Sequence, residues 1–84
     1  MLLKQEKWVY NILMAVILNE KNLSKIIRET RKAAKLSQLE LAELSGVGKT
    51  LIFNLEKGHT QIHFDNLLKV LKVLNIKLQA ELPL

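Results

Sequence analysis

The chain has no cysteine among its 84 residues. Disulfide bonds, thiol catalysis and metal sites built on thiolates are therefore excluded, and the composition fits a reducing cytoplasm. Proline and glycine are also scarce, with 1 and 3 residues, and the sequence shows no internal repeat and no low-complexity linker. A chain of this length suits one small domain and no more.

Apolar runs long enough to span a bilayer are also missing. The longest run, VYNILMAVIL at residues 9–18, has about half of the roughly 20 residues that a membrane helix requires. Lys4 and Lys7 precede it, as in a secretory signal, but no A-x-A-like cleavage site follows. Periodicity does not separate helix from strand here, and we interpret this N-terminal extension as a buried helix or an interface in a soluble protein.

Acidic residues are fewer than basic ones, with 8 Asp and Glu against 13 Lys and Arg and a formal net charge of +5. A basic small domain suggests a polyanionic partner, nucleic acid first and a membrane surface second. Charge that serves solubility alone explains the same excess. Hydrophobic residues make up 49% of the chain, as in globular proteins. Because so short a chain buries only a modest core, a core shared in an oligomer is expected.

Residues 46–50 read GVGKT, which matches the end of the nucleotide-binding P-loop motif G-x-x-x-x-G-K-[ST]. In that motif the first glycine would stand at position 43, where the chain has Glu43. A carboxylate there repels phosphate, and its side chain hinders the tight turn that glycine permits. No acid–base cluster and no Walker B acid after a strand accompany the motif, so an enzyme is not expected.

Periodicity and capping residues predict four helices after residue 18, followed by one strand. The helices are expected at residues 19–34, 38–45, 48–58 and 64–74, and the strand at residues 76–82. Asn19 is the expected first N-cap, and Ser37 and Glu40 form a capping box. The expected apolar positions of these helices are Leu23, Ile26, Ile27, Thr30, Ala33 or Ala34, Leu39, Leu41, Ala42, Leu44, Phe64, Leu67, Leu68, Leu71 and Leu74.

The two short middle helices satisfy the demands of a helix-turn-helix. Ala42 is small where the two helices must touch, and Gly46 can adopt the left-handed conformation of the turn. Val47, Ile52 and Leu55 are apolar where the second helix must pack on the first. Several independent positional demands are met together, which makes this pattern specific.

Residues 23–58, LSKIIRETRKAAKLSQLELAELSGVGKTLIFNLEKG, resemble the XRE (Cro/C1-type) helix-turn-helix family. The resemblance implies a mainly α, five-helix lambda-repressor-like domain at residues 19–75, with residues 1–18 outside it. The ending DNLLKVLKVLNIKLQAEL is similar to that of HipB-like antitoxins, in which a C-terminal β-strand is shared across a dimer. Lys35 departs from the family pattern, which usually has glycine or asparagine there; it either takes left-handed geometry or caps the helix carbonyls by its charge.

The resemblance also implies roles for individual residues on a DNA-binding surface. The residues expected to contact bases are Lys49, Thr50, Phe53 and Asn54. The residues expected to contact phosphates are Ser37, Gln38, Lys35 and Lys57. Two alternatives stay open. Lys49 could be an ordinary solvated surface lysine, and Phe53 could pack against Leu51 or a partner instead of contacting DNA. A structural salt bridge is implied between Arg31 and Glu56. His59 and His63 are four residues apart without a third ligand nearby, so no metal site and no cofactor are expected.

A lone strand in a helical domain leaves backbone groups unpaired, so the C-terminal segment 76–84 is expected to pair with its two-fold mate. With the axis at Gln79, Lys77 opposes Glu81 of the other chain. The full dimer strand is Ile76, Lys77, Leu78, Gln79, Ala80, Glu81 and Leu82.

The leading hypothesis is a bacterial, cytoplasmic and nucleoid-associated repressor that binds palindromic operator DNA as a homodimer. By resemblance it would be the antitoxin of a HipBA-like system and would also bind a HipA-like kinase toxin. One alternative is a stand-alone XRE regulator of phage or restriction-modification type. Another is a protein–protein interaction through residues 9–18. No membrane and no small-molecule substrate are expected as partners.

Overall fold

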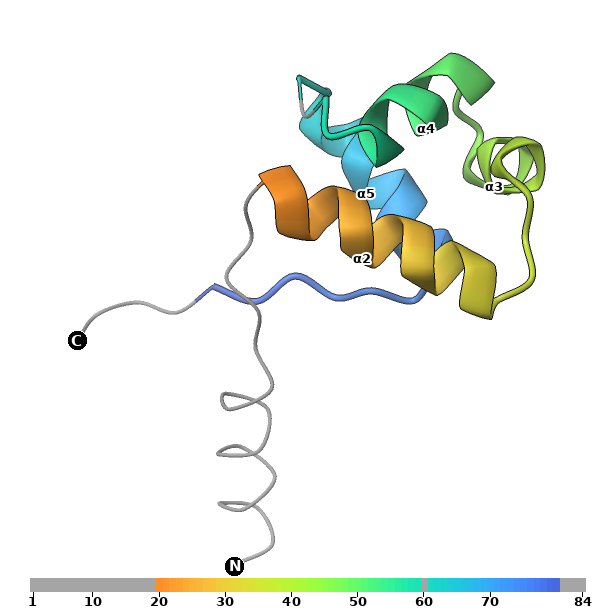
Figure 1. The fold of residues 1–84 in the computed structure, drawn as a ribbon. Coiled ribbons are helices and arrows are strands. Elements are labelled where there is room, and N and C mark those ends of the chain that lie inside the picture. The colour runs from red at the N-terminus through yellow and green to blue at the C-terminus, as the bar shows by residue number, and fades with distance from the viewer. Residues whose placement is uncertain (1–19, 60, 81–84) are drawn as a thin grey trace, which may run out of the picture.

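The computed structural model describes residues 20–59 and 61–80. Within them the chain forms four helices, α2 (Glu20–Ala33), α3 (Gln38–Ser45), α4 (Lys49–Glu56) and α5 (Phe64–Val73). Figure 1 shows α2 crossing in front of α5, with α3 beyond the C-terminal end of α2 and α4 above α2. The expected N-cap Asn19 and the expected helix at residues 9–18 lie outside the described residues, so the five-helix count stays a prediction.

A single apolar core joins the four helices. α3 packs against both α4 and α5, and α2 packs against α4. Every helix contributes a side chain to the fully buried set, and these side chains are Ile27, Leu41, Ile52, Leu55, Val70 and Leu71. Each such burial contributes about 1.5–3 kcal/mol relative to an exposed side chain. The helix-turn-helix is therefore held from two sides, by α2 on α4 and by α5 on α3.

All four helices end in the same hydrogen-bond pattern. The residue with positive φ follows the last turn, and the N–H after it donates back five residues, as in Leu36 to Arg31 (3.1 Å) and Val47 to Ala42 (3.0 Å). The positive-φ residues are Lys35 (59°), Gly46 (72°), Gly58 (94°) and Asn75 (57°). This arrangement satisfies carbonyls that a helix end leaves free, and it normally selects glycine. Lys35 therefore takes left-handed geometry, which is one of the two options that the sequence left open.

Replacing Lys35 by glycine is expected to raise the free energy of unfolding by about 0.5–1 kcal/mol. Left-handed geometry costs a residue with a Cβ about 1–2 kcal/mol, and the greater freedom of glycine in the unfolded chain cancels part of the gain. Urea unfolding followed by circular dichroism measures the change. Lys25→Gly is the matched control, because Lys25 is exposed within α2, where glycine costs about 1 kcal/mol. Equal losses in both variants would mean that the Lys35 side chain stabilises the helix end by its charge.

The structure corrects the expected inner faces of three helices. At the C-terminal end of α2, Ala33 and Ala34 are both exposed. Leu39 and Leu44 of α3 are 48% and 62% exposed, and Phe64 and Leu68 of α5 are 64% and 42% exposed. The buried stripe of α5 is instead Leu67, Val70, Leu71 and Leu74, which follows the same three-and-four spacing. In α3 only Leu41, Ala42 and Ser45 are buried, because a helix of two turns presents one narrow face to α4 and α5.

Residues 76–80 form no strand within the described part of the chain. Figure 1 draws this segment as an extended trace that leaves the end of α5. Ile76 packs against the core, while residues 77–80 are exposed. Residues 81–84 lie outside the described residues. Since the expected strand requires a second chain, its pairing stays a prediction.

Candidate nucleic-acid interface

The helix α4 separates its residues cleanly into an inner and an outer set. Ile52 and Leu55 are 0% and 1% exposed and anchor the helix in the core. Lys49 and Thr50 are exposed on the other side. Asn54, one turn further along, is half-buried. α4 therefore directs polar, hydrogen-bonding side chains outward from its first two turns, while its apolar side holds it in place.

The turn before α4 depends on Gly46, whose φ of 72° lies in the left-handed region. An added Cβ at this position would meet nothing within 4 Å, so backbone conformation rather than space requires glycine here. Gly48, with φ −75° and ψ 149°, is the N-cap of α4. The segment GVGKT thus joins one helix to another, whereas a P-loop joins a strand to a helix.

Phe53 and Lys57 form a contact that was not expected from the sequence. The ammonium of Lys57 lies 4.4 Å from the centroid of the Phe53 ring, within the range of a cation–π interaction. Phe53 is 44% exposed. The two residues are one helical turn apart, so their spacing in the sequence is a signal for this pair. The two side chains form one cationic, apolar surface at the end of α4.

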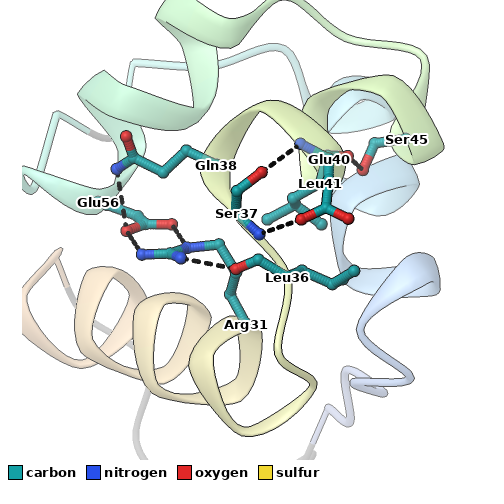
Figure 2. A network of polar contacts seen from close by, with 8 residues as sticks. All are labelled: Arg31, Leu36, Ser37, Gln38, Glu40, Leu41, Ser45 and Glu56. Carbon is teal, nitrogen blue, oxygen red and sulfur yellow. Dashed lines mark hydrogen bonds and ion pairs between the residues drawn. The ribbon is translucent and has the colours of Figure 1, made fainter.

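A network of polar contacts fixes α4 relative to α2 and α3 (Figure 2). The Nε and Nη2 of Arg31 donate to the two carboxylate oxygens of Glu56 at 2.6 and 3.0 Å. The Nη1 of Arg31 donates to the carbonyl of Leu36 at 2.8 Å, and the Nε2 of Gln38 donates to Glu56 at 3.2 Å. The salt bridge that the family resemblance implied is thus present and bidentate. The hydrogen bond to Glu56 raises the pKa of the Arg31 guanidinium, so Arg31 remains charged.

The N-terminus of α3 carries the capping box that the sequence predicted. The hydroxyl of Ser37 accepts from the N–H of Glu40 at 3.0 Å, and the N–H of Ser37 donates to the Glu40 carboxylate at 2.9 Å. The bond from the Ser37 N–H, and then the Ser37 hydroxyl, hold the pKa of Glu40 below its usual value. Two N–H groups of this helix start are thereby satisfied within the chain.

The capping box makes the stability of the domain sensitive to acid. Because the folded pKa of Glu40 is depressed, the contribution of its carboxylate is complete above the unfolded pKa and is lost as pH falls through the folded one. Glu40→Gln keeps an acceptor for the Ser37 N–H but cannot titrate. Thermal melting at pH values between about 5 and 3 should show a smaller loss of stability in the variant than in the natural chain. Glu43→Gln, an exposed change in the same helix, is the control, and parallel profiles for Glu40→Gln would contradict this role.

The residues expected to contact phosphate differ in their exposure and in the hydrogen bonds that they already make within the chain. Ser37 and Gln38 both have partners within the chain, which are Glu40 and Glu56. Ser37 is exposed and retains its hydroxyl proton as a donor, whereas the side-chain amide of Gln38 is half-buried against α4. Lys35 is exposed at the end of α2. The bond from Gln38 to Glu56 joins residues 18 positions apart, and no local sequence pattern indicates it.

Other types of site receive little support from the described residues. Nowhere in residues 20–59 and 61–80 do three His, Asp or Glu side chains gather so as to hold a metal ion. No helix in the same part of the chain has the length and hydropathy needed to cross a membrane.

The comparisons with known proteins agree with this geometry. The model of the helix-turn-helix family matches residues 27–80. A solved structure, the restriction-modification controller protein C.AhdI from Aeromonas hydrophila, has 33% sequence identity and a TM-score of 0.64, over 69% of this chain and 88% of that chain. No curated protein sequence matches the chain. The family match spans α3, α4 and α5 and the second half of α2, which is the part that carries the outward face of α4.

Proposed function

Because the chain belongs to the XRE-type helix-turn-helix family, we propose that it is a transcription regulator of the restriction-modification controller type, which binds palindromic operator DNA as a homodimer. The observation that carries this proposal is the arrangement of α4. Its apolar side is fixed in the core by Ile52 and Leu55, and its first two turns present polar side chains outward. A helix held this way can enter the major groove by its N-terminal end.

The residues proposed to contact bases match the chemistry of base edges. Lys49 donates to the O6 and N7 of guanine, and Asn54 pairs with the N6 and N7 of adenine. Thr50 has a methyl group for contact with thymine. Phe53 lies further along the helix and is covered on one face by Lys57. We therefore assign Phe53 to the edge of the groove, where its exposed ring contacts a thymine methyl and orients Lys57 toward the backbone.

Phosphate contacts are proposed on both sides of α4. Lys57 supplies the charge at its C-terminal end, and Lys35 supplies it near the start of α3. The Ser37 hydroxyl has a proton to donate, while Gln38 acts from beside Glu56 and contributes mainly by holding α3 against α4. The formal net charge of +5 favours this contact with a polyanion at low salt.

The homodimer is proposed to form through the C-terminal segment. Residues 77–80 are exposed and leave backbone donors and acceptors for an antiparallel partner strand. A shallow hollow of about 260 Å³, lined in part by Leu68, Ile76 and Leu78, lies beside this segment. Leu68 and Leu78 are 42% and 41% exposed, so pairing of two copies would cover apolar surface as well as backbone groups. Two copies would set two α4 helices about one DNA turn apart.

The controller hypothesis is preferred to the antitoxin hypothesis. The similar solved structure is a restriction-modification controller with 33% identity, and no observation on the described residues favours a HipBA-like role or a kinase toxin. The genes beside this one separate the two hypotheses. A restriction endonuclease or methyltransferase gene supports a controller, and a kinase-like gene supports an antitoxin.

A mobility-shift titration on the DNA upstream of the protein's own gene tests the proposal. The expected result is saturable binding with two chains per site and a preference over scrambled DNA of about 10³-fold or more. Affinity should fall steeply as salt concentration rises. Binding without sequence preference, or no salt-sensitive binding, would contradict the proposed function.

A further inference from the structure

A hollow of about 430 Å³ lies between α4, the loop that follows it and the start of α5. Its wall includes Thr50 and Asn54 from α4, His59 and His63 from the loop, and Asn66 from α5. Two of the side chains proposed to face bases therefore share this hollow with both histidines of the chain. A duplex that places a base edge against Asn54 brings the adjoining sugar-phosphate backbone to the same side of α4.

The charges around this hollow restrict what can fill it. None of the described residues that line it is Lys, Arg, Asp or Glu, so among these side chains only an imidazole can carry a positive charge. Lys57, at the end of α4, has its ammonium over Phe53, and Glu56 is bound by Arg31. In the first turn of α5, Asp65 is exposed. No carboxylate among the lining residues therefore competes with an anion for the two histidines.

The two histidines are available to a ligand. His59 and His63 are both exposed. His63 is the N-cap residue of α5, but its side chain makes no capping hydrogen bond. A protonated imidazole donates from both ring nitrogens, and histidine changes charge between about pH 5 and 8. Phosphate diesters accept such bonds and keep their negative charge over this range.

We infer that the hollow is a proton-linked phosphate site, in which protonated His59 and His63 bind one phosphate of the operator backbone. This inference rests on the proposed function and adds a regulator to it, the ambient pH. Since the bound phosphate favours the charged imidazoles, complex formation takes up protons. Affinity that depends on the histidine charge is present at low pH and is lost as pH rises.

Fluorescence anisotropy on the upstream DNA at about pH 6 and about pH 8, at constant ionic strength, tests the inference. The natural chain should bind at least about tenfold more tightly at the lower pH, since a charge-assisted hydrogen bond contributes on the order of one such factor and a dimer carries two copies of the site. His59→Gln/His63→Gln should show less than about a twofold difference. His59→Lys/His63→Lys carries a permanent charge and should bind at the higher pH as tightly as the natural chain does at the lower one. Circular dichroism melting at both pH values verifies that each variant is folded.

The outcomes separate the two proposals. Equal pH dependence in the natural chain and the glutamine variant would overturn the phosphate site and leave operator binding intact. Weak binding by a folded lysine variant would also overturn it, because charge alone should replace the imidazoles. If the natural chain bound no DNA at either pH, the proposed function would fail, and the phosphate site would fail with it.

Discussion

Replacement of Arg31 by methionine is expected to lower the free energy of unfolding by about 3–5 kcal/mol. The side chains of Arg31 and Glu56 are only 11% and 4% exposed, so the change leaves a carboxylate in the interior without its cation. Only the hydrogen bond from Gln38, at 3.2 Å, would remain to it. Because small domains have a total stability of about 5–15 kcal/mol, urea unfolding at neutral pH should show a domain near the limit of folding.

The double change Arg31→Met/Glu56→Leu separates two contributions to the free energy of unfolding: the penalty of burying one unpaired charge and the net stabilisation by the ion pair. Replacing both partners by apolar residues of similar volume is often neutral, so the double variant should recover most of the stability that Arg31→Met loses. A loss below about 1 kcal/mol in the single variant would mean that the pair is solvated and does not tie α2 to α4. Equal losses in the single and double variants would mean that packing of the Arg31 stem matters more than its charge.

Local signals in the sequence were sufficient to predict the helix-turn-helix. The capping box at Ser37 and Glu40 and the turn at Gly46 depend on residues a few positions apart, and both occur as expected. The inner face of α5 could not be predicted in the same way. Two stripes with helical spacing share Leu67, Leu71 and Leu74, and packing against α3 selects the one that contains Val70. Periodicity is equal in both stripes, so only tertiary contacts decide between them.

In the candidate interface, too, features set by nearby residues could be predicted from the sequence, and features set by distant residues could not. The outward side chains of α4 follow from its two buried anchors, Ile52 and Leu55, and these could be found from the sequence. The partner of Gln38 could not, because Glu56 lies 18 residues away. Lys35 is a third case, in which the residue type disfavours the geometry it adopts. There the hydrogen bond from Leu36 to Arg31 stabilises a helix end that the lysine alone would not select.

Asn54→Ala is expected to lower operator affinity by about 2–6 kcal/mol, because a bidentate base contact contributes about 1–3 kcal/mol and a dimer uses it twice. Asn54 is half-buried, and its buried neighbours in α4 are unchanged, so the fold should persist. Lys49→Ala should act in the same way at a different base position. Anisotropy titrations with operator and scrambled duplexes measure the ratio of the two affinities, which should fall toward one in both variants.

Lys57→Ala is the matched comparison, because Lys57 lies on the same exposed side at the end of α4 but is proposed to bind phosphate. A phosphate contact contributes no sequence information, so its loss should weaken binding to operator and scrambled DNA equally. It should also reduce the slope of log affinity against log salt by about 1 for each contact removed. Asn54→Ala should leave that slope unchanged, since an uncharged side chain displaces no counterion. If Asn54→Ala and Lys57→Ala changed the affinity ratio and the salt slope alike, α4 would not lie in the groove in the proposed orientation. The division between base and phosphate contacts along this helix would then be wrong, even if the protein binds DNA.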